Sequence, residues 1–254
     1  MSPCENEILR VNLRLSLRLM TGTGRAGSHR VGRRQRLVFP VGLLLVLCTV
    51  STRAAEPATI TFSLNFPDSD PERYTITVQS DGHARYECLA KISDESDERE
   101  TYQAEFSFSD ATRAQIFDLA ARAHYFSGKV DSGSRKVAFT GAKKLTYKDG
   151  QRETTAAYNF SSLPAVQQLT TMFQSVSATL EFGRRLAYYH RYQKLALDDE
   201  LKHMEDEVKR GDLLELQAVK PVLQQIYDDG SVLNGVRARA QRIMEMGNGP
   251  APAR

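Results

Sequence analysis

The most distinctive chemistry in the sequence lies in a cluster of basic and aromatic residues between positions 184 and 192. Guanidinium and phenol groups that interleave in this way can stack on flat groups and neutralise anions, such as nucleic acids, anionic glycans or phospholipid headgroups. In the alternative interpretation, the tyrosines pack inside the protein and the arginines pair with nearby acids. We therefore consider one possible interaction patch, which consists of Arg184, Arg185, Tyr188, Tyr189, Arg191 and Tyr192.

A second residue that could do chemistry is Cys88, whose thiolate would be a nucleophile if a distant histidine lay beside it. Tyr86 and Ala90 stand two residues before and after it, on the same face of a predicted strand. Free cysteine among such neighbours usually behaves as a small buried apolar residue. The sequence therefore predicts a buried thiol, and we assign no catalytic residue.

The spacing of the ligand types does not support a metal or cofactor site. Four histidines follow residue 54, and no two of them have the i, i+4 spacing of a helical zinc site. Residues 22–27 spell G-x-G-x-x-G, but an arginine cluster follows them where a dinucleotide-binding fold needs a helix. We expect no metal and no cofactor. A hydrolase in which the fold joins His124 or His190 to acidic residues remains an alternative.

An export signal is the clearest motif in the sequence. Basic residues between Arg30 and Arg36 precede an apolar run, 37–50, and small residues around Ala54 follow it as a cleavage site. The run has 14 residues, whereas a helix that crosses a bilayer needs about 20. We therefore expect residues 1–54 to be a leader that is removed, which places the protein in the periplasm or outside the cell. If it is not cleaved, the apolar run would anchor the protein to the membrane instead.

The net charge of +3 comes from this leader. Residues 1–54 hold nine arginines and two acidic residues, which leaves 25 basic and 29 acidic residues in the remainder. The basicity therefore gives no reason to expect a nucleic-acid partner. Cys4 and Cys48 also belong to the leader, so the remaining Cys88 cannot form an internal disulfide.

The first part of the remainder has the pattern of an α+β domain. Apolar and polar residues alternate as they do in strands, and Asp81-Gly82 and Asp149-Gly150 supply turns for two hairpins. Ser109 is placed to cap a helix between the hairpins. The sequence predicts an antiparallel sheet with one or two packed helices.

From Ser162 onward the apolar residues recur at helical spacing. Gly211 is expected to end one helix, and Asp212 to begin the next with Glu215 as its capping-box partner. Pro221 must kink that helix or begin it anew. The predicted divisions after the leader are an α+β domain, an α-helical C-terminal module and a disordered tail, over 55–178, 179–246 and 247–254.

The order of these motifs resembles a family of uncharacterised secreted or lipid-anchored bacterial domains. The matching residues are the strand 74–78, Asp81-Gly82, Tyr86, Phe108-Ser109 before the helix, and Tyr125-Phe126 near its end. The helical remainder resembles exported proteins of acidobacterial type. The resemblance covers about half of the chain after the leader, and it implies an exported structural domain without implying any catalytic residue.

These observations together predict an exported envelope protein that does not catalyse a reaction and that binds a protein or a surface component. The periplasmic hydrolase is one alternative. The other is a carrier of a small ligand, which would need an apolar cavity between the sheet and the helices. Contact with a membrane is expected only through an uncleaved leader.

Overall fold

The computed structural model describes residues 56–67, 69–91, 98–134 and 136–247. The predicted leader lies outside these residues, and so does the predicted tail except for Gly247.

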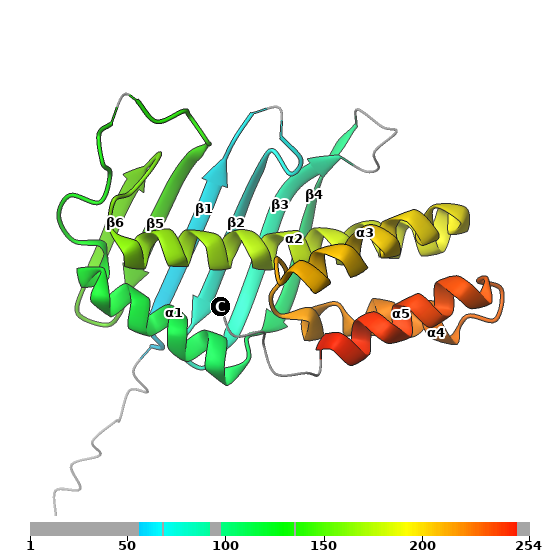
Figure 1. Cartoon of the computed structure of the whole chain (residues 1–254). Coiled ribbons are helices and arrows are strands. Elements are labelled where there is room, and N and C mark those ends of the chain that lie inside the picture. Colours follow the sequence, from blue (N-terminus) through cyan, green and yellow to red (C-terminus); the bar gives the residue numbers. More distant parts are fainter. Residues whose placement is uncertain (1–55, 68, 92–97, 135, 248–254) are drawn as a thin grey trace, which may run out of the picture. The chain divides into compact units, whose positions relative to one another are not determined.

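Alternation of apolar and polar residues builds a sheet of six antiparallel strands within the described residues, in the order β4-β3-β2-β1-β5-β6 (Figure 1). The buried apolar residues of the strands share one face of the sheet, and the predicted antiparallel sheet is confirmed. The strands are β1 (Thr59–Asn65), β2 (Arg73–Gln79), β3 (His83–Lys91), β4 (Arg99–Ser107), β5 (Ala142–Lys148) and β6 (Glu153–Tyr158).

Both predicted Asp-Gly turns join neighbouring strands. Gly82 has a φ of 99°, which an L side chain rarely adopts, and the backbone N–H of His83 donates to Asp81 Oδ1 at 3.0 Å. In the second turn the backbone N–H groups of Gln151 and Arg152 each donate to Asp149 Oδ1 at 2.8 Å. In each turn the aspartate carboxylate therefore accepts hydrogen bonds from backbone N–H groups.

Two helices, α1 (Asp110–Arg122) and α2 (Pro164–Tyr192), cover one face of the sheet (Figure 1). Ser109 caps α1 as predicted, because its hydroxyl accepts from the backbone N–H of Thr112. The core lies between α2 and the sheet, where the rings of Phe62 and Phe173 stack with their centroids 5.2 Å apart.

The remaining helices form the predicted C-terminal helical module, which confirms the α+β class. Short 3₁₀ turns, η1 (His124–Phe126), η2 (Lys194–Ala196) and η3 (Leu216–Ala218), connect the elements. The three helices of the module are α3 (Leu197–Arg210), α4 (Lys220–Asp228) and α5 (Asn234–Gly247).

The predicted division between residues 178 and 179 falls inside α2, which continues without a break for 29 residues. Its buried stripe runs on from Phe173 to Leu186, so the first half of α2 packs on the sheet and the second half packs on α3 and α4. The sheet and the helices belong to one compact unit. The change of hydrophobic period therefore marks the start of α2 rather than a boundary between separate bodies.

Glu215 does not form the predicted capping box. It has a φ of 60° in the loop before η3, and α4 begins at Lys220 with Pro221 in its first turn. Its carboxylate instead accepts two hydrogen bonds from Ser109, from the backbone N–H at 2.8 Å and from the hydroxyl at 2.9 Å. A contact with Ser109, which is 106 residues away in the sequence, thus replaces the predicted local contact with Asp212. Pro221 begins a new helix, which was one of its two predicted outcomes.

Candidate functional site

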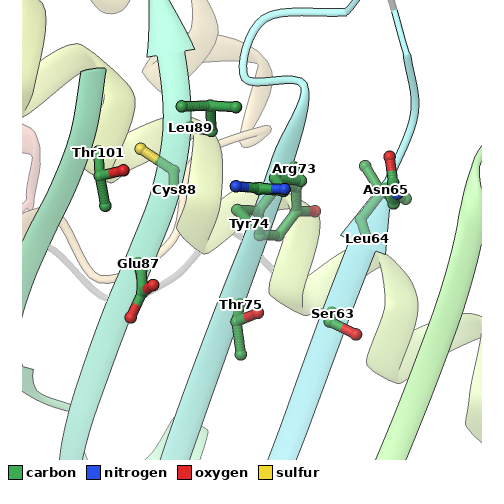
Figure 2. Close-up of a pocket in the computed structure, with 10 residues that line it drawn as sticks. All are labelled: Ser63, Leu64, Asn65, Arg73, Tyr74, Thr75, Glu87, Cys88, Leu89 and Thr101. Atoms are coloured by element: carbon green, nitrogen blue, oxygen red, sulfur yellow. The ribbon is translucent and has the colours of Figure 1, made fainter. Parts of the chain in front are cut away.

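The face of the sheet opposite α2, which we call the open face, carries most of the polar residues of the strands. No described helix lies on it in Figure 1. A hollow with a volume of about 240 Å³ lies on this face across β1, β2, β3 and β4 (Figure 2). The residues that line it are Ser63, Leu64, Asn65, Arg73, Tyr74, Thr75, Glu87, Cys88, Leu89 and Thr101.

A second hollow, of about 260 Å³, adjoins the first because the two share Ser63 and Thr75. It extends to Lys144 and Thr146 of β5. Hydroxyl pairs flank this region, with 3.1 Å between the Oγ1 atoms of Thr61 and Thr77. Hydroxyls both donate and accept, so this surface can bond to the amide or hydroxyl groups of a partner.

The two charged residues of the first hollow, Glu87 and Arg73, differ in whether they have an ion-pair partner. Glu87 lies 3.9 Å from Arg85 and also accepts from Gln103 at 3.4 Å. Within the described residues Arg73 has no ion-pair partner, and its side chain is exposed. Figure 2 shows Arg73 between Leu89 and Asn65. The hollow therefore offers a guanidinium that has no partner within the described residues, among hydroxyl and amide groups, and such a set can bind polar or anionic groups.

Cys88 touches the hollow through its strand, but its thiol lies on the helix side and is buried, as predicted. Sγ donates to Glu181 Oε1 at 3.1 Å. Burial, followed by the charge of Glu181, raises the pKa of Cys88 to about 12. The thiol therefore stays protonated at neutral pH, which makes it a hydrogen-bond donor and a poor nucleophile.

Glu181 and Arg184 form a buried ion pair beside this thiol, with 2.9 Å between Arg184 Nε and Glu181 Oε2. Tyr86 donates its hydroxyl proton to Glu181 at 2.7 Å. Burial, and next the charge of Glu181, raise the pKa of Tyr86 well above its usual value. Arg184 also donates to the backbone carbonyl of Lys91 at 2.7 Å. This cluster ties α2 to β3.

The six residues of the predicted interaction patch do not share one exposed surface. Arg184 and Tyr189 are buried, because the inner stripe of α2 includes their positions. Arg185 pairs with Glu200 at 2.7 Å. Tyr188 is half-buried and lies 5.1 Å from Tyr192, measured between ring centroids. The exposed residues of the patch are Arg191 and Tyr192.

The histidines considered for catalysis lie away from both hollows. His190 Nε2 lies 2.9 Å from Asp229 Oδ2, and Lys194 donates to the same oxygen at 2.6 Å. Hydrogen bonds from Lys194, and then from Ser231, hold the pKa of Asp229 well below its usual range. This contact joins the end of α2 to the α4–α5 turn. His124 is exposed.

The sequence identified the polar residues of β2 and β3 as one face of a sheet but gave no sign of the hollow. The shape of the hollow depends on the order and register of neighbouring strands, which the alternation of residues within one strand does not predict. The Glu181–Arg184 pair did leave a signal, since an acid and a base interrupt the apolar stripe of α2 at i, i+3 spacing.

No known protein-family model and no curated protein matches this chain. Among the described residues, no helix combines the length and apolar character needed to cross a bilayer. The same residues contain no group of three or more histidine, cysteine or acidic side chains that could hold a metal ion.

Proposed function

We propose that this protein is an exported envelope protein that binds a protein or a surface component and does not catalyse a reaction. The docking surface is the open face of the sheet. The observation that carries this proposal is the hollow on that face, where Arg73 lies among hydroxyl and amide groups and has no ion-pair partner in the described part of the chain.

The chemistry of the hollow supports binding rather than reaction. Its lining includes Arg73 and Glu87 as charged groups, and neither is placed to activate a hydroxyl as a histidine would. The one thiol at its border is held protonated by burial. The carrier alternative needs a cavity between the sheet and the helices, whereas both hollows lie on the opposite side of the sheet.

The proposed location follows from the leader. A basic segment, an apolar run over 37–50 and small residues around Ala54 support export and cleavage. The mature protein then faces the periplasm or the exterior. In the anchored alternative the same surface would face that compartment while residues 37–50 held the chain to the membrane.

Crosslinking in intact host cells tests both parts of the proposal. A photo-reactive amino acid replaces Thr101, an exposed residue at the rim of the hollow, and in a matched control it replaces Lys202, an exposed residue of α3. We expect a specific envelope adduct from position 101 alone, and we expect Arg73→Glu to weaken it. The N-terminus of the adduct should begin near Ala55.

Two results would contradict the proposal. Equal adducts from positions 101 and 202 would show that the open face is not a specific docking surface. An unprocessed chain in the cytoplasm would show that the protein is not exported.

A further inference from the structure

The two edges of the sheet differ in how they are protected. At the β6 edge, Ala156 and Tyr158 are buried on the helix side, and the hydroxyl of Thr154 donates to the carbonyl oxygen of Tyr125 in η1. The guanidinium of Arg152 lies 4.4 Å from the ring centroid of Tyr125. The turn η1 therefore covers one end of this edge.

Among the described elements, none covers the β4 edge as η1 covers the β6 edge. Among the described strands β4 pairs with β3 alone, through nine consecutive residue pairs without a bulge. Its sequence, RETYQAEFS, contains neither proline nor lysine, the residues that commonly block edge pairing. On its helix side Tyr102, Ala104 and Phe106 are only half-buried. This leaves an open row of backbone groups beside a partly exposed apolar row.

The charges on β4 favour a basic partner. Arg99 pairs with Glu72, and Arg85 of the neighbouring strand donates to Gln103 at 2.7 Å. Glu100 and Glu105 are exposed, and neither has an ion-pair partner among the described residues. Two unpaired carboxylates therefore lie along the free edge, one on each face of the strand.

We propose that β4 binds an extended peptide segment of a partner protein, which adds to the sheet as a seventh strand. Main-chain hydrogen bonds to the edge supply affinity in this mode of recognition, and alternate side chains supply specificity. The segment has apolar residues opposite Tyr102, Ala104 and Phe106 and a basic residue opposite Glu105. This site shares Thr101 with the open-face hollow, but it consists of the backbone edge of β4 and does not depend on the function proposed for the hollow.

A second copy of the chain fits this edge less well than a peptide. Antiparallel pairing of β4 with its own copy has a two-fold axis perpendicular to the sheet, so both helix layers would lie on the same side. Figure 1 shows α3 and α5 extending past β4, into the space that the helices of the second copy would need. An added strand needs a width of only about 4.8 Å.

Fluorescence anisotropy with the purified chain tests the site. The probe is the labelled nine-residue peptide SVRVTVTKS, which in antiparallel register places valines opposite the apolar row, arginine opposite Glu105 and lysine opposite Glu100. A control peptide, SVVVTTRKS, has the same composition without the alternation. We expect saturable binding of the first peptide and no binding of the second.

Matched variants locate the binding. Glu105→Arg should weaken binding at least about fivefold, because it opposes the peptide arginine with a like charge. Glu153→Arg makes the same charge change on the same face at the opposite edge strand, β6, and should leave affinity within about twofold because it does not oppose the peptide. Arg73→Glu, in the open-face hollow, should also leave binding unchanged. Circular dichroism checks that each variant is folded.

Three results would overturn the proposal. The first is no binding of the alternating peptide, and the second is equal binding of both peptides. The third is a dimer in light scattering that Glu105→Arg converts to a monomer, since the edge would then serve a second copy of the chain.

Discussion

The carboxylate of Glu181 collects hydrogen bonds from the hydroxyl of Tyr86, the thiol of Cys88 and the guanidinium of Arg184 in the interior. A buried charge is tolerated when an opposite charge and hydrogen-bond donors surround it, and it is strongly unfavourable when one partner is removed. These residues therefore act as a structural connection between β3 and α2.

Glu181→Gln should lower the free energy of unfolding by about 3 kcal/mol, because it leaves the buried Arg184 without its counter-charge. Urea denaturation monitored by circular dichroism measures the change. Glu245→Gln, at an exposed position of α5, is the control and should change stability by less than about 0.5 kcal/mol. Equal effects of the two substitutions would contradict the assignment.

Cys88 should resist alkylation in the folded protein. Its pKa is raised to about 12, so the reactive thiolate is scarce at pH 8, and burial blocks access. Iodoacetamide treatment followed by peptide mass spectrometry should show modification of Cys88 only in urea. Because the folded pKa is raised, the stabilising contribution of this thiol is complete below its unfolded pKa of about 8.5 and is lost as the pH rises toward 12. Rapid alkylation without urea would refute the buried assignment.

At the level of elements, the alternation of residues in β2 and β3 and the helical spacing after Ser162 were enough to predict the sheet and the helical module. These patterns did not predict the contacts of side chains whose partners are distant in the sequence. Glu215 satisfies a local capping pattern, yet its carboxylate bonds to Ser109 across the fold. Likewise, Arg184 and Arg191 are both basic residues of one helix, and only the packing of α2 buries the first and exposes the second.

The crossing of α2 and the segment before α4 depends on Gly183. A Cβ added there would lie 2.5 Å from Val219 Cγ1. Gly183→Ala should therefore destabilise the protein by about 1–3 kcal/mol through overpacking. Val219→Ala removes the obstructing methyl groups, so it should make Gly183→Ala less damaging when the two are combined. Thermal unfolding of the four variants in this cycle measures the coupling, and strict additivity would contradict the close approach.

The contact between α3 and α5 should depend on pH through Glu205. A hydrogen bond from Arg242 outweighs burial and, with Lys209, lowers the pKa of Glu205 to about 2. A depressed folded pKa stabilises the protein fully above the unfolded pKa of about 4.3, and that stabilisation is lost as the pH falls toward 2. Glu205→Gln should flatten the fall in stability between pH 5 and pH 2 in acid titrations. If the slope of stability against pH does not change, other carboxylates cause the loss of stability in acid.

For the whole molecule, the continuity of α2 predicts cooperative unfolding. The same helix supplies core residues to the sheet through Phe173 and to the helical module through Leu186. Far-ultraviolet circular dichroism and tyrosine fluorescence should therefore report one transition with coincident midpoints. Two separated midpoints would show that the sheet and the module unfold independently, as the division predicted between residues 178 and 179 would imply.

The position of β1 also affects the time course of folding. β1 lies in the middle of the sheet, where it pairs with β2 on one side and with β5, about 80 residues later in the chain, on the other. Loop-closure entropy must be overcome before so distant a pairing forms, and sheets with such pairings fold slowly. In the export that we propose, a chain that enters a translocation pore from its N-terminus cannot complete β1 pairing until β5 has emerged, so folding is expected to follow transport.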